Sequence, residues 1–302
     1  MSDAAVRSGT EDVDELAPPA VRPARAAWQR FLRYRLALPG AVVLAAMVVI
    51  SFGGPLIYGI DPNAVDPAQY RRPPTAEHWL GTDSAGRDVL ARLLVGGQVS
   101  LLVGLAAALT ATVVGVLLGA LAGFLRGWAD AVLCRIAEVA QAFPTLIVII
   151  TVAALIGPSL PAMIIVIALM DWTGGFRVVR GLTLALREQD SILAITGLGA
   201  RNSRIIGRHV VPAVLGPATV VATGMVGTVI MLEAALSFLG LGVPPPTSSW
   251  GSMLNQAQSL AILESMPWMW LPPGLAIAIT VLAVNFVGEG LRNAVDPRQG
   301  QR

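Results

Sequence analysis

The sequence predicts an all-α membrane protein with six transmembrane helices. Its 302 residues are 55% hydrophobic and 13% charged, and their mean hydropathy is +0.68. An average soluble domain carries about twice that share of charged residues. Long apolar runs alternate with polar loops, and a helix is the element that satisfies its own backbone inside lipid. The single cysteine, Cys134, excludes an internal disulfide framework and a cysteine-rich metal site.

Residues 1–35 predict a cytoplasmic, disordered tail. Acidic residues come first, prolines follow, and an arginine run precedes the first apolar segment. We expect residues 36–60 to form the first span. A cleaved signal peptide is the alternative, but the apolar run is too long and lacks a small-residue cleavage site at its end.

Residues 61–97 predict a polar, proline-rich loop outside the membrane, and the loop contains the segment HWLGTDSAGRDVLARLL. Thr82 or Asp83 could cap a helix, and Arg87 could pair with Asp83 or Asp88. Direct contact with a substrate is the alternative to this structural role. The positions singled out in the segment are Gly81, Thr82, Asp83, Gly86, Arg87, Asp88 and Arg92.

Five further spans are expected, and residues 98–290 are assigned to this five-helix core. They cover 93–125, 131–156, 161–180, 210–232 and 269–288. Gly115, Gly119 and Gly123 lie four residues apart in the second span and predict a ridge for close helix packing. The apolar run 139–170 could be one bent span, but its central GPSLP turn favours two. Two spans place 187–212 and the tail 291–302 on the cytoplasmic side, where the positive-inside rule expects arginine.

Residues 187–212 form a long polar island that predicts two short helices joined at Gly199. One face would be apolar and the other rich in arginine. Such a shape suits the groove of a partner protein. An ordinary basic cytoplasmic loop is the alternative.

Two carboxylates, Asp171 and Glu233, fall in predicted spans. An ionisable side chain in lipid is a functional candidate, so both could line a translocation path. The structural alternatives are a pair between Asp171 and Arg177, and a capping or pairing role for Glu233.

Five blocks between His78 and Arg298 resemble, in the right order, the C-type permease subunits of ATP-binding-cassette importers for dipeptides, oligopeptides and nickel. The blocks are the GTDxxGRD segment, QAFPTLIVII, DWTGGFRVVR, LEAALSFLGLGVPPPTSSWG and GEGLRNAVDPRQ. The island is similar to the family's cytoplasmic coupling loop, although Leu193-Ala194-Ile195 stands where the family usually has Glu-Ala-Ala. The resemblance assigns ATPase coupling to Ala194, Gly199, Ala200, Arg204, His209 and Pro212.

The resemblance implies the type I importer permease fold and no enzymatic activity. It also implies a homologous second permease, ATP-binding subunits, an extracytoplasmic binding protein and a peptide cargo, with nickel as the alternative. The sequence has no lysine and no GxxxxGK[ST] stretch, so we expect no cofactor in this chain and ATP on the partner subunits. No metal site or nucleic-acid partner is expected. An ion-coupled transporter is the competing class, but no internal repeat supports it.

Overall fold

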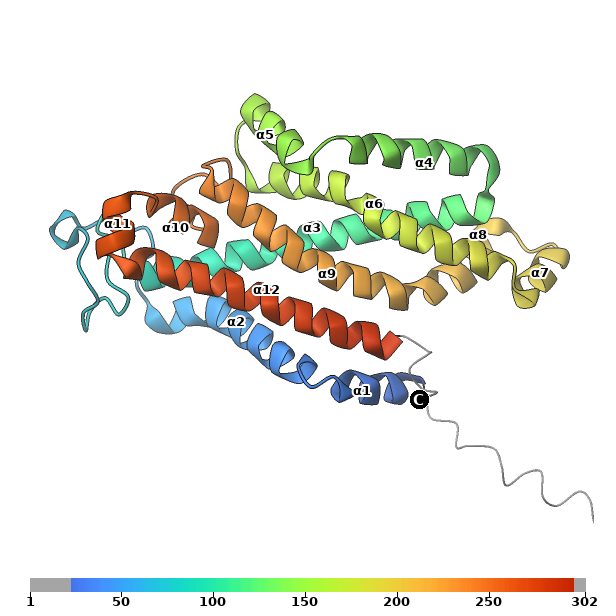
Figure 1. Ribbon diagram of the computed structural model, residues 1–302, viewed down its shortest axis with the longest axis horizontal. Helices are drawn as coiled ribbons and strands as arrows, with labels where there is room; N and C mark the ends of the chain where they lie inside the picture. Colours follow the sequence, from blue (N-terminus) through green and yellow to red (C-terminus); the bar gives the residue numbers. More distant parts are fainter. Residues whose placement is uncertain (1–22, 296–302) are drawn as a thin grey trace, which may run out of the picture.

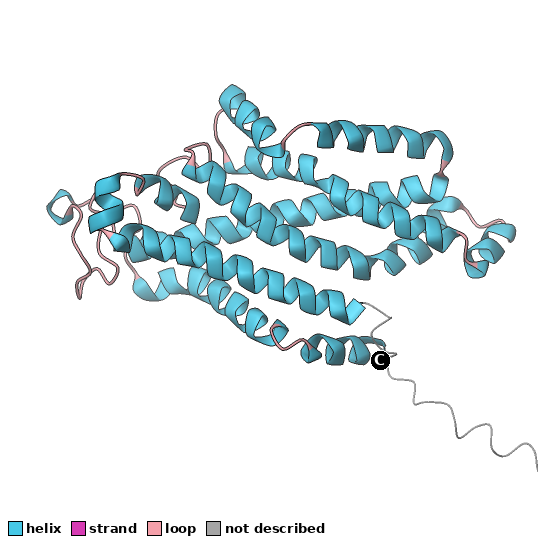
Figure 2. Cartoon of the chain, viewed as in Figure 1, coloured by secondary structure: helices cyan, strands magenta, loops and turns pink. Residues whose placement is uncertain are grey.

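A computed structural model of the chain describes residues 23–295, and the regular elements within that range are helical (Figure 2). Its longer helices are α2 (Ala37–Tyr58), α3 (Val89–Leu125), α4 (Gly127–Ala142), α5 (Thr145–Ile156), α6 (Leu160–Arg187), α9 (Val211–Phe238) and α12 (Pro267–Val295). The shorter elements are α1 (Pro23–Arg33), the 3₁₀ turn η2 (Pro67–Gln69), α7 (Asp190–Gly197), α8 (Asn202–Ile205), the π-helical turn η3 (Ile206–Val210), α10 (Trp250–Gln256) and α11 (Leu260–Ser265).

Five uninterrupted helical segments within residues 23–295 are long and apolar enough to cross a membrane. They are α2, α3, α6, the continuous segment Asn202–Phe238, and α12. The pair α4 and α5 makes a sixth span if it is counted as one, and its two helices are bent by 80°. The protein is therefore a multi-pass membrane protein.

The span expected over 131–156 is divided between α4 and α5 in the structure. The helix breaks at Phe143 and Pro144, both of which have extended backbone conformations. A proline lacks the amide hydrogen that a helix needs and disfavours helical geometry in the preceding residue.

The helix boundaries differ from the sequence prediction in other places. The predicted loop 61–97 ends at Asp88, where α3 begins. The α6 helix continues to Arg187, and the helix predicted for 210–232 continues to Phe238. Part of the predicted disordered tail is also helical, because Pro23–Arg33 forms α1 and Phe31 packs beside Ala294 of α12. Residues 1–22 and 296–302 lie outside the described part of the chain.

The long helices run along the long axis of the molecule and leave a different set of segments at each end (Figure 1). One end, called the loop end below, holds residues 59–88 with α10 and α11. The other, called the elbow end, holds α1, α7, α8 and the last turn of α12. With α4 and α5 counted together as one span, an even number of crossings separates α1 from α7 and α8.

Packing of α3 against α6 builds the centre of the bundle. A Cβ atom on Gly115 would lie 2.8 Å from the Trp172 carbonyl oxygen, and one on Gly119 would lie 2.8 Å from that of Phe176. A Cβ atom on Gly123 would lie 2.7 Å from the Cβ atom of Thr183. The predicted glycine ridge is therefore confirmed, and it lets the two backbones approach closely.

Candidate functional site

The polar island forms a helical elbow between α6 and α9. The α7 helix ends at Gly197, the chain turns through Gly199 at φ +79°, and α8 follows from Asn202. A residue with a Cβ atom rarely adopts this left-handed conformation, whereas glycine does so at little cost. The prediction of two short helices joined at Gly199 is confirmed.

The elbow has one buried face and one exposed face. Ile192, Ile205 and Val210 are buried in a cluster with Val116, Phe124 and Val179. On the other face Arg201, Arg204, Arg208 and His209 are exposed, and Leu198 at the tip is 88% exposed. An exposed leucine beside a set of arginines is suited to a partner surface that is both apolar and acidic.

The structure brings together some of the predicted coupling residues. A cavity of about 340 Å³ is lined by Ile195, Leu198, Ala200, Arg204, Ile205, Arg208 and His209. Ala194 and Pro212 are exposed outside this lining, Pro212 in the first turn of α9.

At the loop end, Asp83 and Arg87 fix the turn before α3. The Asp83 carboxylate accepts hydrogen bonds from the amides of Ala85 and Arg87, at 2.7 and 3.0 Å, and from Arg87 Nε at 2.8 Å. Gly86 has φ +76°, and a Cβ atom there would lie 1.8 Å from the Asp66 carbonyl oxygen. The predicted pair between Arg87 and Asp83 is confirmed.

The cap of α3 is Asp88, not the predicted Thr82 or Asp83. Asp88 Oδ1 accepts from the Ala91 amide at 2.7 Å. Its Oδ2 atom lies 2.8 Å from His78 Nδ1 and 3.0 Å from the donating Tyr58 hydroxyl. The Thr82 hydroxyl instead donates to the Gln69 carbonyl and accepts from the Arg72 amide at 2.8 Å.

The signature residues are enclosed rather than open to a ligand. Thr82, Asp83, Asp88 and Arg92 are at most 4% exposed. Arg92 Nε lies 3.6 Å from Asp83 Oδ2, and the carbonyl of Gly81 accepts from the Val89 amide at 3.0 Å. These contacts support the structural role for the segment over direct substrate contact.

Three hydrogen bonds tie the loop end together. Arg87 Nη2 donates to Gln256 Oε1 of α10 at 3.2 Å, and Trp268 Nε1 of α12 donates to the Thr82 carbonyl at 3.3 Å. Trp250 Nε1 of α10 donates to the Leu93 carbonyl at 3.0 Å. The loop, α10 and the first turn of α12 are thereby joined to the start of α3.

Glu233 is a buried joint between three helices. Its side chain is 0% exposed, and it accepts from the hydroxyls of Ser100 on α3 at 2.8 Å and Ser237 on α9 at 2.7 Å. The Trp250 amide of α10 donates to Ser100 Oγ at 3.3 Å. Glu233 therefore lines no open path in this conformation, and the contacts fit the structural alternative.

Asp171 is half-buried on α6. The next residue, Trp172, is buried, whereas Gly174, three residues after Asp171, has open space around it. Within residues 23–295 its carboxylate has no hydrogen bond or ion pair, so the predicted pair with Arg177 is absent. An unpaired carboxylate in a span remains a candidate for contact with a passing substrate.

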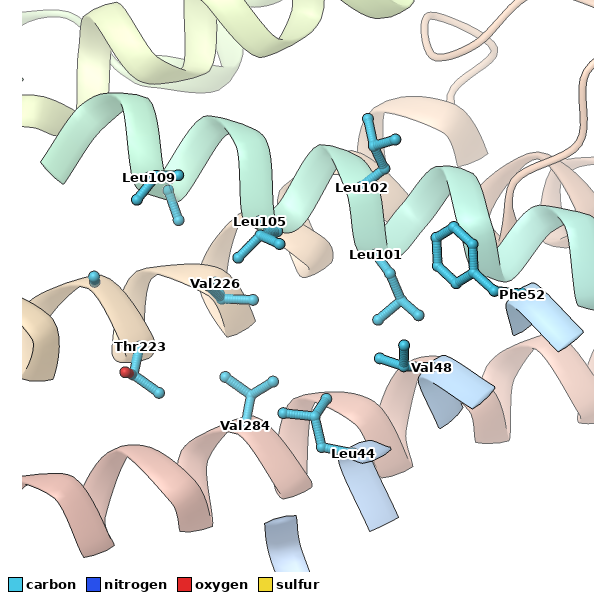
Figure 3. Close-up of a pocket in the computed structure, with 12 residues that line it drawn as sticks. Leu44, Val48, Phe52, Leu101, Leu102, Leu105, Leu109, Thr223, Val226 and Val284 are labelled. Carbon is cyan, nitrogen blue, oxygen red and sulfur yellow. The ribbon is translucent and has the colours of Figure 1, made fainter. Parts of the chain in front are cut away.

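An apolar groove lies between α2, α3, α9 and α12 (Figure 3). It measures about 550 Å³, and Phe52, Leu105 and Val284 are among the side chains that face it. Its lining carries no charged side chain, so it offers nothing to the charged ends of a peptide.

The described residues contain no group of three or more His, Cys, Asp or Glu side chains that could hold a metal ion.

Sequence reasoning missed the ion pair between Asp130 of α4 and Arg180 of α6, and it missed Ser100 as a partner of Glu233. A serine inside an apolar span was the available signal for Ser100. For Asp130 the signal was a lone acidic residue in the first turn of a helix.

Two family models match the chain. The model described as the inner membrane component of binding-protein-dependent transport systems matches residues 115–301. The chain belongs to this family. The model for the N-terminal transmembrane domain of oligopeptide transport permease C matches residues 22–74.

Curated relatives extend over nearly the whole chain. A protein of Brucella suis biovar 1, provisionally named a peptide permease protein, is 42% identical over 93% of both chains. A dipeptide transport system permease protein of Alkalihalophilus pseudofirmus is 38% identical over 92% of this chain and 91% of its own. A glutathione transport system permease protein of Escherichia coli O6:K15:H31 is 39% identical over 90% of this chain and 89% of its own. The chain is thus a permease component of an importer of this family, with the all-α architecture expected for it.

Proposed function

We propose that the chain is one transmembrane subunit of an ATP-driven peptide importer. It would form half of the translocation path with a homologous second permease, and ATP-binding subunits and an extracytoplasmic binding protein would complete the assembly. The names of the relatives support peptides as cargo, from dipeptides to glutathione. The chain itself would catalyse no reaction, and ATP would bind to the partner subunits.

The observation that carries the proposal is the exposed elbow. The glycine-jointed turn presents Leu198 and several arginines away from the bundle, at the end of the molecule that also holds α1. An ATPase groove that grips this surface would transmit its closure to α6 and α9, the two helices that the elbow joins. We infer that the elbow end faces the cytoplasm, because arginine is concentrated there.

Asp171 is the residue of the described spans that best suits contact with cargo. A peptide carries an α-ammonium group at neutral pH, and an unpaired, half-buried carboxylate on α6 offers it an opposite charge. The enclosed carboxylate of Glu233 is not available in this way.

Gly199→Val tests the elbow. Valine at φ +79° strains the backbone by roughly 1–2 kcal/mol, and no atom near the site would clash with its side chain. In the reconstituted transporter we expect uptake of a labelled dialanine to fall strongly while ATP hydrolysis continues. Gly197→Val is the matched control, since Gly197 has open space and ordinary helical geometry. Wild-type uptake in Gly199→Val would remove the elbow from the mechanism.

Purification of a tagged subunit separates the importer from an ion-coupled transporter. An importer subunit should bring an ATPase with it, and uptake should stop when ATP is depleted. Uptake by the isolated chain without ATP would refute the proposed function.

A further inference from the structure

The α4 helix is weakly held by apolar packing. Of its residues in the described structure, Ala137 alone is buried, with Leu133 and Cys134 packed partly against α3 and α6. Trp128 is 80% exposed, and Val132, Ile136 and Val139 are also exposed. Helices in a membrane are held together by close packing and by polar contacts, because lipid already covers their apolar side chains. Since α4 packs little against its neighbours, polar contacts must contribute much of what positions it.

A bidentate ion pair joins α4 to α6. Arg180 Nε lies 2.5 Å from Asp130 Oδ1, and Arg180 Nη2 lies 2.7 Å from Asp130 Oδ2. The two side chains are 32% and 18% exposed. Two parallel hydrogen bonds between a planar guanidinium and a carboxylate fix orientation as well as distance.

Two further links lie closer to the elbow. Arg126, at the joint between α3 and α4, pairs with Glu188, the C-cap residue directly after α6. Arg187 Nη1 donates to the Phe124 carbonyl at 2.6 Å, and its guanidinium lies 5.6 Å from the centre of the Phe124 ring. The α7 helix of the elbow begins at Asp190, directly after these contacts.

We propose that Asp130, Arg180, Arg126 and Glu188 form a coupling clamp that makes α4 move together with the elbow-bearing end of α6. The clamp rests on the proposed function, because an ATPase must move the elbow. The 80° bend at residues 143–144 then carries the displacement of α4 into α5 and the membrane. Without the clamp, few packing contacts would remain to make α4 move when α6 moves. These four residues are positioning residues and do not contact cargo.

The single cysteine provides the readout. Cys134 Sγ lies 3.6 Å from Asp130 Oδ1 and is partly buried on the side of α4 that faces α3 and α6. Separation of α4 from α6 would expose this thiol to N-ethylmaleimide. The alkylation rate is measured in the complete transporter, at rest and trapped with ATP and vanadate, with cysteine-free partner subunits. The ratio of the two rates within one variant cancels the effect of a lost neighbouring charge on thiol reactivity.

In the wild type we expect a rate ratio near one, because α4 follows α6. In Asp130→Asn and Arg180→Gln we expect the ratio to rise, and dialanine uptake per ATP hydrolysed to fall, each by roughly fivefold or more. The double variant that exchanges the two charges, Asp130→Arg with Arg180→Asp, should return the rate ratio and the uptake per ATP most of the way to their wild-type values. Arg135→Gln with Glu138→Gln is the matched control, because this exposed pair at 2.8 Å lies wholly within α4.

Unchanged uptake per ATP, or an unchanged rate ratio, in both single variants would overturn the clamp. Failure of both single variants to assemble would also overturn it, since the pair would then be only a structural brace. These outcomes are distinct from failure of the proposed function, in which the wild-type complex itself would not couple uptake to ATP hydrolysis.

Discussion

Single residues in the spans of this protein illustrate two uses of a buried carboxylate. Glu233 is fully enclosed and satisfied by two hydroxyls, whereas Asp171 is half-buried and unpaired within the described residues. A polar group that is enclosed and bonded fixes helices, while an unpaired one is free to meet a ligand. Burial and partners therefore separate two residues that looked equivalent in the sequence.

Replacing Glu233 with alanine should destabilise the subunit. The change leaves the Ser100 and Ser237 hydroxyls without their acceptor and opens space where α3, α9 and α10 meet. We expect a loss of about 2–4 kcal/mol, since a buried hydroxyl left unsatisfied costs about 1–3 kcal/mol and the deleted side chain leaves a cavity. Thermal unfolding of the detergent-solubilised complex measures it.

Glu264→Ala is the control for that experiment, because Glu264 is an exposed acid on α11. The midpoint temperature of thermal unfolding of this variant should stay near that of the wild type. Equal midpoints for the two variants would show that Glu233 contributes nothing to the joint.

How far the site could be predicted depends on the distance between partners along the chain. Asp83 and Arg87 are four residues apart, and Gly199 acts through its own backbone, so local spacing was sufficient for both. Glu233 and Ser100 are 133 residues apart, and Asp130 and Arg180 are 50 apart. Such pairs depend on how the helices pack, which hydropathy and spacing do not determine.

At the scale of elements, hydropathy predicted the spans because lipid imposes a minimum apolar length on each of them. It did not predict their exact shape. The run 127–156 has the length and composition of one span, yet Pro144 divides it into α4 and α5. The α1 helix was missed because its three arginines were assigned to a charged tail, and Phe31 is covered only when α12 folds back beside it.

The glycine ridge of α3 predicts a sharp difference between a glycine inside the α3–α6 contact and a glycine outside it. A side chain at Gly119 would meet the Phe176 carbonyl at 2.8 Å, and that backbone atom can move only with α6 itself. Gly119→Leu should cost about 1–3 kcal/mol, the usual range for overpacking, or prevent assembly. Yield and thermal midpoint of the complex measure the effect.

Gly174→Leu, on α6, is the matched control, since nothing lies within 4 Å of a Cβ atom there in this chain. A helical leucine at that site should be tolerated by the isolated fold. If Gly119→Leu were as stable as Gly174→Leu, the close approach of α3 and α6 would be refuted.

At the scale of the whole molecule, the even number of crossings predicts that Ser203 and α1 face the same compartment. In a Cys134→Ala background, Ser203→Cys should be labelled by an impermeant maleimide only after the cells are opened. Ala64→Cys, on the exposed loop at the other end, should be labelled in intact cells. Labelling of Ser203→Cys from outside would reverse the orientation and remove the route from ATP to the elbow.

The hydrogen bonds that join residues 59–88, α10 and the start of α12 have a mechanical consequence. Arg87, Trp250 and Trp268 brace one extremity of the bundle, while the opposite extremity carries the hinge at Gly199. A rotation of the helices would then have its pivot near the braced extremity and its largest amplitude at the hinge. Force applied at the hinge would act on the longest available lever arm, so a smaller force would supply the torque that tilts the spans.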